Sequence, residues 1–372
     1  MSSESNTQAK PQVQLGDQFT MGRPLATGGA ARIFLARQIS LDRDVVVKVL
    51  RRQLSTQEEF RLRFAEEAKL LARLEHANIV QVIDAGEQDG FYYFVMEYVR
   101  GGSLRDLMER AESLPVDIAL AMAYFTARGM VYMHEHHILH LDIKPANILL
   151  TREGVVKVAD FGLARLIDRQ RSRESGDGSG HPAGTPLYMS PEQVKGATLD
   201  ARSDIFSFGI VLYQLLTGVT PFRGRSSDEV FREILHGQVP PPSELREEIP
   251  SCVDNLVMTC LGRDRSLRFS RGESLIAELH GVLERLGIHR PDERLRGYLS
   301  DPNHYRKVIK RDPVDALKAA RPSLLSRLSK PLAVTGVTVA LMGIDIWLLG
   351  SLGALGGQIA RLWHSFVAAL PF

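Results

Sequence analysis

The sequence predicts an α+β fold of two lobes, in which a small antiparallel sheet precedes a larger, mainly helical part. Short runs of β-branched and aromatic residues fill residues 19–50 and return at 78–99. Between them, residues 58–76 show the spacing of one amphipathic helix, and helical patterns dominate after residue 104. With 372 residues, 44% of them hydrophobic, the chain can bury a large core.

The first lobe begins with two strands, RIFLARQ and DVVVKVL, joined by the polar turn SLDR. The helix at 58–76 follows, with Phe60, Phe64 and Leu71 among charged residues, and it ends near His76. Two further strands, NIVQVIDAGEQ and FYYFVMEYV, are separated by an Asp-Gly turn. These elements predict an antiparallel sheet with one helix.

The second lobe is helical, with only brief strands at ILLT and VVKVAD. Residues 169–184 are rich in Ser, Gly and Arg without hydrophobic periodicity, so we expect a loop there. Helices are expected at 105–112, 117–137, 203–218, 226–236, 252–261 and 271–286.

The chain divides into five predicted regions. They are a disordered tail at 1–18; a globular domain at 19–286, with lobes at about 19–98 and 99–286; a basic juxtamembrane linker at 287–330; a transmembrane helix at 331–352; and an interfacial helix or second short span at 353–372.

Membrane association is predicted because Asp345 is the only formal charge between residues 332 and 360, a run longer than the ~20 residues that cross a bilayer. Arg321, Arg327 and Lys330 precede this run, which keeps the globular domain on the cytoplasmic side. We therefore expect a single-pass protein of the inner membrane that contacts lipid. Small residues four apart in the apolar run would also allow two chains to associate as a homodimer.

The composition argues against two other classes. The formal charge of +2 gives no general attraction for nucleic acid. Cys252 and Cys260 have neither zinc spacing nor the pattern of a disulfide-rich fold, which favours a reducing compartment.

Four polar residues predict the chemistry. Asp142, Asn147 and Asp160 provide a carboxylate, an amide five positions later and a second carboxylate before Phe-Gly, a set that can bind a metal and align a hydroxyl group. Lys48 is the only charge in the apolar strand VVVKVL and suits a phosphate. Phosphoryl transfer needs little more than cations and alignment.

In these motifs and their order, residues 19–286 resemble protein kinases, specifically bacterial Ser/Thr kinases with the eukaryotic-type fold. The matching motifs are LATGGAARIF as the Gly-rich loop, MEYV as the hinge, HLDIKPAN as the catalytic loop, DFG as the metal motif, GTPLYMSPE as the end of the activation segment and SDIFSFG as the supporting helix. Arg268 would pair with Glu192. Lysine two positions after Asp142, together with GTPLY, fits Ser/Thr kinases better than tyrosine kinases.

The resemblance implies ATP as cofactor, Mg²⁺ or alternatively Mn²⁺ as metal, and proteins as substrates. The implied catalytic residues are Asp142, Lys144, Asn147 and Thr185, and the implied metal ligands are Asn147 and Asp160. The implied cofactor-binding residues are Leu25, Gly28, Gly29, Ile33, Val46, Lys48, Glu67, Met96, Glu97, Val99 and Asp160.

Three positions depart from the family pattern. Ala26 and Ala31 replace glycines of the Gly-rich loop, and Leu141 replaces the arginine that would receive an activation-loop phosphate. We therefore expect altered nucleotide affinity, and activity that does not strictly need phosphorylation of the loop serines. The departures also keep open an alternative, a pseudokinase scaffold that binds nucleotide without catalysis.

The stretch HEHHILH raises the question of a metal site. By the resemblance, His140 belongs to the catalytic loop as a structural residue. His134, His136 and His137 end a predicted helix, where the helix dipole favours histidine. Ile138 breaks the H-E-x-x-H zinc pattern, so metal binding is the weaker alternative.

Overall fold

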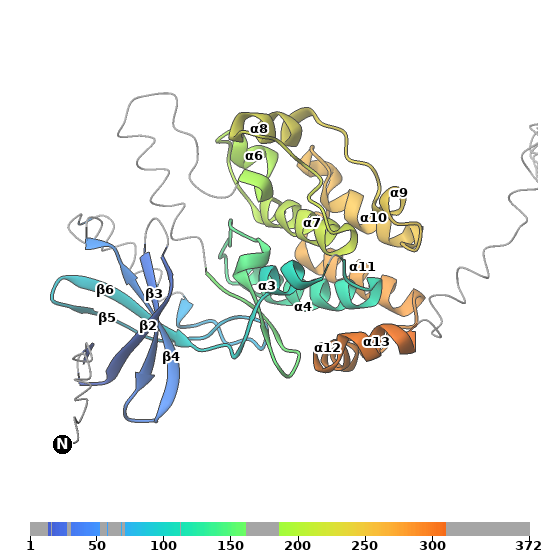
Figure 1. Ribbon diagram of the computed structural model, residues 1–372. Coiled ribbons are helices and arrows are strands. Elements are labelled where there is room, and N and C mark those ends of the chain that lie inside the picture. Colours follow the sequence, from blue (N-terminus) through green and yellow to red (C-terminus); the bar gives the residue numbers. More distant parts are fainter. Residues whose placement is uncertain are drawn as a thin grey trace, which may run out of the picture. The chain divides into compact units, whose positions relative to one another are not determined.

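The structure is a computed structural model, drawn in Figure 1. It describes residues 14–15, 17–27, 31–52, 58, 68, 71–111, 113–160 and 186–309. Over these residues the predicted α+β architecture is confirmed, since strands come first and helices follow. Figure 1 shows strands β2 to β6 together in one lobe and helices α4 and α7 in the other.

An antiparallel sheet of six strands, in the order β1-β2-β3-β4-β6-β5, makes up the first lobe. The strands are β1 Gln14–Leu15, β2 Phe19–Thr27, β3 Ala31–Gln38, β4 Arg43–Leu50, β5 Val82–Gln88 and β6 Phe91–Glu97. The predicted turn between β5 and β6 is confirmed: Asp89 and Gly90 have φ of 52° and 76°, as a type I′ hairpin turn requires.

Strand β4 has two different faces. Val45 and Val47 are fully buried and pack with Phe19 and Val95 in the core of the sheet. Because successive side chains of a strand point to opposite faces, Val46 and Lys48 face the other side, toward the second lobe. The apolar run VVVKVL thus supplies core residues on one face and, on the face toward the second lobe, one cation.

The prediction of a disordered tail over 1–18 is wrong at its end. Gln14 and Leu15 form β1 and pair with Thr20 and Phe19 of β2. Leu15 is buried in the core of the sheet. Two residues are too few for a strand to show its period in the sequence.

Helices α4 and α7 form the centre of the second lobe. α4 is buried along most of its length and contacts α7, α11, α12 and β9, as a helix in the middle of a domain does. The helices are α3 Leu104–Arg110, α4 Val116–Glu135, α6 Pro191–Val194, α7 Ala201–Thr217, α8 Ser227–His236, α9 Pro242–Leu245, α10 Ser251–Cys260, α11 Gly272–Arg285, α12 Pro291–Ser300 and α13 Pro302–Ile309. Six of these helices match predicted ranges: α3, α4, α7, α8, α10 and α11. The four-residue helices α6 and α9 were not predicted, and neither were α12 and α13.

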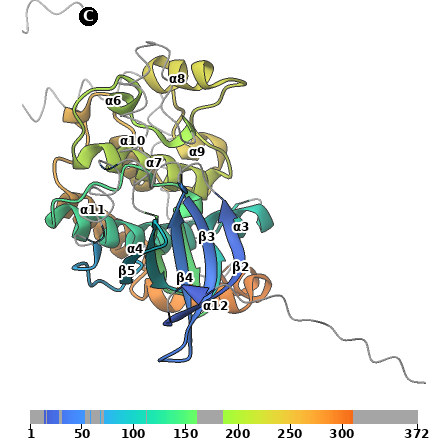
Figure 2. The ribbon, with the colours of Figure 1, turned by 90° about the vertical axis from the view of Figure 1, so that its left-hand side faces the viewer.

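A second, three-stranded sheet begins just after the last strand of the first lobe. Its strands are β7 Gly101–Ser103, β8 Ile148–Thr151 and β9 Val156–Val158, in the order β7-β8-β9. β8 begins one residue after Asn147 and β9 ends two residues before Asp160. Figure 2, turned by 90°, shows the larger sheet in front of this region. The β8–β9 hairpin therefore brings two of the predicted site residues to the same place.

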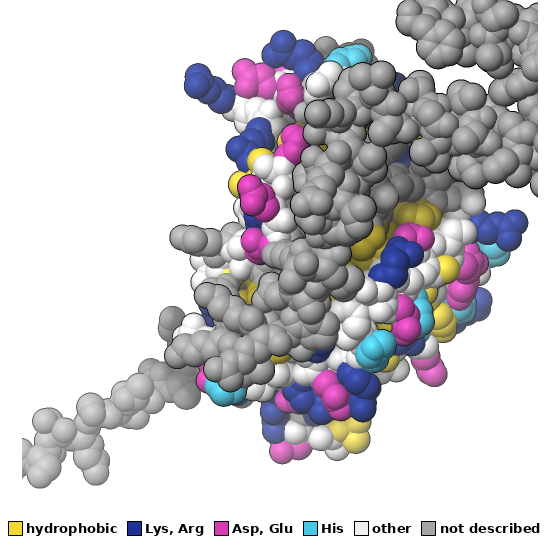
Figure 3. All heavy atoms as spheres, turned by 90° about the vertical axis from the view of Figure 1, so that its right-hand side faces the viewer, with side chains coloured by type: hydrophobic (Ala, Val, Ile, Leu, Met, Phe, Trp, Pro, Cys, Tyr) yellow, Lys and Arg dark blue, Asp and Glu magenta, His cyan; other side chains and the backbone are white. Residues whose placement is uncertain are grey.

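The interpretation of 287–330 as a linker is corrected over 291–309, where α12 and α13 form. Leu295 and Tyr298 are buried, and α12 packs against α4. Residues 310–330 lie outside the described part of the chain. Figure 3 shows one face of the molecule, on which basic and acidic side chains are interspersed.

No helix within the described residues is long and apolar enough to cross a membrane. The predicted transmembrane helix at 331–352 and the helix or span at 353–372 both lie outside those residues.

Candidate active site

Lys48 and Asp160 meet although 112 residues separate them. Lys48 Nζ donates to Asp160 Oδ1 at 2.8 Å. In the register of the sheet, Lys48 lies opposite Ile33 on β3 and Val46 lies opposite Met96 on β6, so these four side chains share one face. The strand lysine is thus held in a polar contact at the edge of an otherwise apolar surface.

The charge of Lys48 keeps Asp160 ionised. Burial raises the pKa of the Asp160 carboxyl, but the charge of Lys48 and the hydrogen bond from it more than offset this, so the pKa lies below its ordinary value. Asp160 also has φ of 60°, a left-handed conformation that side chains rarely adopt. An ionised carboxylate held in an unusual backbone conformation is typical of a functional site.

The catalytic loop holds the carboxylate of Asp142 from two sides. Lys144 Nζ lies 2.7 Å from Asp142 Oδ2, and Asn147 Nδ2 donates to the same oxygen at 2.9 Å. Asn147 Nδ2 also donates to the Asp142 carbonyl at 2.9 Å. The 3-10 turn Pro145–Asn147 makes this return possible, with Asn147 N–H donating to the Lys144 carbonyl at 2.9 Å.

The two predicted metal ligands are joined through the backbone. Ala159 N–H donates to the Asn147 carbonyl at 2.8 Å, which fixes Asn147 beside the residue that precedes Asp160. Since Asn147 uses Nδ2 for its hydrogen bonds to Asp142, the assigned amide orientation directs Oδ1 elsewhere. A carboxylate oxygen and an amide oxygen are ligands that Mg²⁺ accepts, so these residues fit the implied metal.

Asp204, at the start of α7, holds the catalytic loop by accepting two of its backbone N–H groups. It is fully buried, and its Oδ1 accepts Leu141 N–H at 2.6 Å while its Oδ2 accepts His140 N–H at 2.8 Å. His134 Nε2 lies 2.8 Å from the same Oδ2. Burial raises the pKa of the Asp204 carboxyl, but these contacts more than offset it and hold the pKa below its ordinary value.

His140 is a structural residue, as the resemblance implied. The ring is buried; its Nε2 lies 3.0 Å from the Ala159 carbonyl and its Nδ1 accepts Asp142 N–H at 3.2 Å. His134 turns toward Asp204 and His136 toward a backbone carbonyl. Over the described residues, no three His, Cys, Asp or Glu side chains are grouped to hold a metal ion.

A cleft of about 1060 Å³ lies between the sheet and the helical lobe. It is lined by nine of the residues predicted from the sequence: Leu25, Ile33, Val46, Met96, Glu97, Val99, Lys144, Asn147 and Asp160. Lys48 and Asp142 do not line it themselves, but each contacts a residue that does, Lys48 with Asp160 and Asp142 with Lys144. Four predicted residues, Gly28, Gly29, Glu67 and Thr185, lie outside the described part of the chain.

Glu97 has a structural use as well as a place in the cleft. Its Oε1 lies 2.6 Å from Lys157 Nζ and accepts Gln81 N–H at 2.9 Å. Its side chain is therefore engaged within the protein, and its backbone N–H also donates to the Gln81 carbonyl at 3.0 Å.

Sequence reasoning missed several residues that build the site. Leu149 and Ala159 line the cleft, and Asp204, His134 and Gln193 support the catalytic loop. Asp204 carried a signal, because it lies in the motif SDIFSFG, which the resemblance had matched to a supporting helix without giving this residue a role. The other four carried none.

Two lobes enclose a cleft with a lysine, carboxylates and an amide beside it, groups of the kind that phosphoryl transfer requires. The model of the protein kinase domain family matches residues 19–279. The chain is 36% identical over 270 residues to a probable serine/threonine-protein kinase of Clostridium perfringens, covering 72% of this chain and 38% of that one. It is 38% identical over 269 residues to the serine/threonine-protein kinase PknB of Mycobacterium leprae, covering 71% of this chain and 43% of that one.

The kinase domain of PknI from Mycobacterium tuberculosis is similar in structure, with a TM-score of 0.56, 27% sequence identity and coverage of 71% of this chain and 96% of that chain. This chain spans less than half the length of the two curated relatives. It belongs to the protein kinase family, and its kinase domain is of the serine/threonine type.

Proposed function

We propose that this protein transfers the γ-phosphoryl group of ATP to serine and threonine hydroxyls of protein substrates, including its own. The observation that supports this most directly is the meeting of two groups in one cleft: Lys48 with Asp160, and Asp142 with Lys144 and Asn147. The first group suits a metal-bound triphosphate, and the second suits an acceptor hydroxyl.

The apolar part of the cleft would take the adenine ring, between Val46 and Met96 on the sheet side and Leu149 on the other. Lys48 would bind phosphate oxygens. Asn147 and Asp160 would hold Mg²⁺, or Mn²⁺ in its place, and the bound metal would neutralise charge on the phosphoryl oxygens. Gly28, Gly29 and Glu67 complete this proposal as residues that position the phosphates and Lys48.

Asp142 would accept the proton of the substrate hydroxyl or orient that hydroxyl toward the phosphoryl group. Its carboxylate is held by Lys144 and Asn147, so it does not have to be ordered during the reaction. Lys144 would also stabilise the negative charge of the transferring group. Thr185 is proposed as a further contact that fixes the geometry of this loop.

A comparison of three proteins, each with all 372 residues, tests the proposal. The wild-type chain should transfer labelled phosphate from ATP to casein and to itself when Mg²⁺ is present, and phospho-amino-acid analysis should give phosphoserine and phosphothreonine. Asp142→Asn should lower the rate by about 10² to 10⁴ while ATP binding is kept. Asp292→Asn, an exposed change on α12, is the matched control.

A pseudokinase scaffold would give a different result: ATP would bind, but the wild-type chain and Asp142→Asn would incorporate equal, background amounts of label. The experiment uses the full chain because α12 and α13, which follow residue 290, belong to the folded unit: α12 packs against α4, and α13 packs against α12.

We also propose that residues 331–352 anchor the protein in the inner membrane, with the kinase domain in the cytoplasm. The support is the apolar run with Asp345 as its only charge and the basic residues before it. Residues 353–372 would lie on the membrane or cross it again, and small residues in the apolar run would allow a homodimer. The full chain should stay in the membrane pellet after alkaline extraction, and deletion of 331–372 should release it.

A further inference from the structure

We propose that Gln193 is a positioning residue of the phosphoryl transfer: its side-chain amide holds the backbone carbonyl of Leu141, the residue before Asp142. Gln193 Nε2 donates to the Leu141 carbonyl at 3.1 Å. This inference rests on the proposed kinase function, because it assigns a role within that reaction. The two residues are 52 positions apart, so the contact joins two segments that each contribute to the cleft.

The local structure of α6 orients the amide. Ser190 precedes the helix, Pro191 begins it, and Gln193 is its third residue. Ser190 N–H donates to Gln193 Oε1 at 2.8 Å, so the oxygen of the amide faces a donor and the nitrogen faces the Leu141 carbonyl. The reverse orientation would set donor against donor and acceptor against acceptor. Gln193 is buried, which keeps water from replacing these contacts.

The peptide that Gln193 holds is in an unusual conformation. Leu141 has φ of 60°, a region that residues with a Cβ rarely adopt. Asp204 Oδ1 accepts Leu141 N–H at 2.6 Å on one side, and Gln193 binds the carbonyl on the other. The carbonyl shares its peptide plane with the N–H of Asp142, which donates to His140 Nδ1 at 3.2 Å. Rotation of this peptide would therefore move Asp142.

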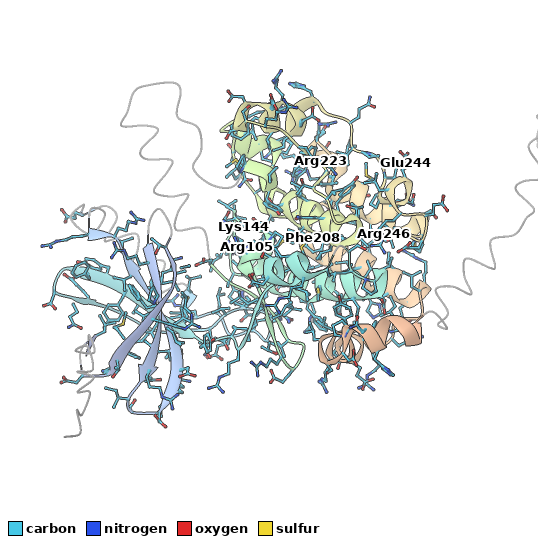
Figure 4. The ribbon with its side chains drawn as sticks, in the orientation of Figure 1. Arg105, Lys144, Phe208, Arg223, Glu244 and Arg246 are labelled. Carbon is cyan, nitrogen blue, oxygen red and sulfur yellow. The ribbon has the colours of Figure 1, made fainter. Side chains whose placement is uncertain are left out.

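The contact also links the catalytic loop to the segment that lines the outer cleft. Tyr188, five residues before Gln193, lines the cleft and donates its hydroxyl to Gln214 on α7 at 2.7 Å. Figure 4 shows Lys144 and Arg105 at the side of the helical lobe where the cleft lies. Leu141 replaces the arginine that, in the family pattern, would link these two segments through a phosphate on the activation loop. Here the amide of Gln193 links them without a charge.

Two substitutions separate this role from simple capping of α6. Gln193→Glu keeps an oxygen for Ser190 N–H, and glutamate at this helix position is a good capping residue. It sets a carboxylate oxygen against the Leu141 carbonyl, however, and removes the donor. Gln193→Met keeps the size and removes both contacts. Gln238→Glu, an exposed change of the same type after α8, is the matched control.

Steady-state kinetics of the full-length proteins provides the first test. We expect Gln193→Glu and Gln193→Met to lower kcat by about tenfold to a hundredfold, since a displaced catalytic group loses rate steeply. The KM for ATP should stay within about twofold of wild type in both, because Lys48 and the apolar lining are untouched. Wild-type kcat in Gln193→Glu would overturn the proposal and leave Gln193 as a helix cap.

Hydrogen exchange gives a second readout that does not need activity. Backbone amides of residues 140–147 should exchange faster in both variants than in the wild type or Gln238→Glu, while those of α11 stay unchanged. Unchanged exchange at 140–147 would also overturn the proposal. If the wild type transfers no phosphate, the proposed function fails, and the exchange rates still decide whether Gln193 holds the loop.

Discussion

The guanidinium of Arg268 forms a two-pronged ion pair with the carboxylate of Glu192: Nη1 lies 2.7 Å from Oε1 and Nη2 lies 3.0 Å from Oε2. Both side chains are buried. Ser203 Oγ donates to the same Oε1 at 2.7 Å, and the Arg268 guanidinium lies over the ring of Phe206 at 4.7 Å. The pair, predicted from the resemblance, fastens the end of the activation segment to the helical lobe.

Removing one partner of this pair should destabilise the domain strongly. Arg268→Ala leaves the Glu192 carboxylate buried without its cation, and we expect a loss of about 3–5 kcal/mol in the free energy of unfolding. Thermal unfolding measures the effect. Arg290→Ala breaks an exposed ion pair with Glu293 and should cost less than about 1 kcal/mol. Equal melting temperatures for the two variants would contradict the prediction.

The charge of Lys48 should matter for the reaction more than for the fold. Lys48→Met removes the cation next to Asp160, and we expect the rate of transfer to fall by about 10² to 10³, as for other lost electrostatic contacts in active sites. The rate of label transfer from ATP is the measurement. Lys195→Met, at an exposed position after α6, should keep the wild-type rate; an equal fall in both variants would argue against a specific role.

Stability should depend on pH through His140. Burial lowers the pKa of His140, and the nearby carboxylate of Asp204 and the carbonyl of Ala159 offset this only in part. The folded protein therefore keeps the ring neutral where the unfolded chain, with a histidine pKa of about 6.5, takes up a proton. Stability should be full above pH 6.5 and fall as the pH drops below it, by up to about 1.4 kcal/mol per pH unit.

His140→Asn tests this reasoning through the slope of stability against pH. Between pH 7 and pH 5 its melting temperature should fall less than that of the wild type, whatever its absolute stability. His289→Asn, a change at an exposed ring, controls for the loss of one histidine. A slope for His140→Asn as steep as that of the wild type would rule out His140 as the source.

The sequence predicted the parts of the site that depend on local pattern and on motif order. Lys48 stood out because it is the only charge in an apolar strand, and Asp142, Asn147 and Asp160 because of their spacing. The structure places Asn147 and Asp160 in the lining of one cleft, with Lys48 in direct contact with Asp160 and Asp142 in direct contact with Asn147.

The parts that could not be predicted depend on contacts between distant segments. Nothing near His134 indicates that it lies against Asp204, 70 residues away, so the helix dipole was a sufficient explanation for it. Gln193 was one polar residue in a short helix without a periodic pattern. The packing of α12 was hidden because Leu295 and Tyr298 are few apolar residues in a basic segment.

Asp117, near the start of α4, contacts both α12 and α13. Its Oδ2 lies 3.1 Å from Arg294 Nη1 and accepts the Tyr305 hydroxyl at 2.6 Å, and the residue is only 3% exposed. Asp117→Asn removes the negative charge from both contacts, and we expect a loss of about 1.5–3 kcal/mol with faster hydrogen exchange over 291–309. Glu293→Gln, at the exposed pair, should leave exchange unchanged, and an Asp117→Asn protein with wild-type exchange there would show that apolar packing alone holds the two helices.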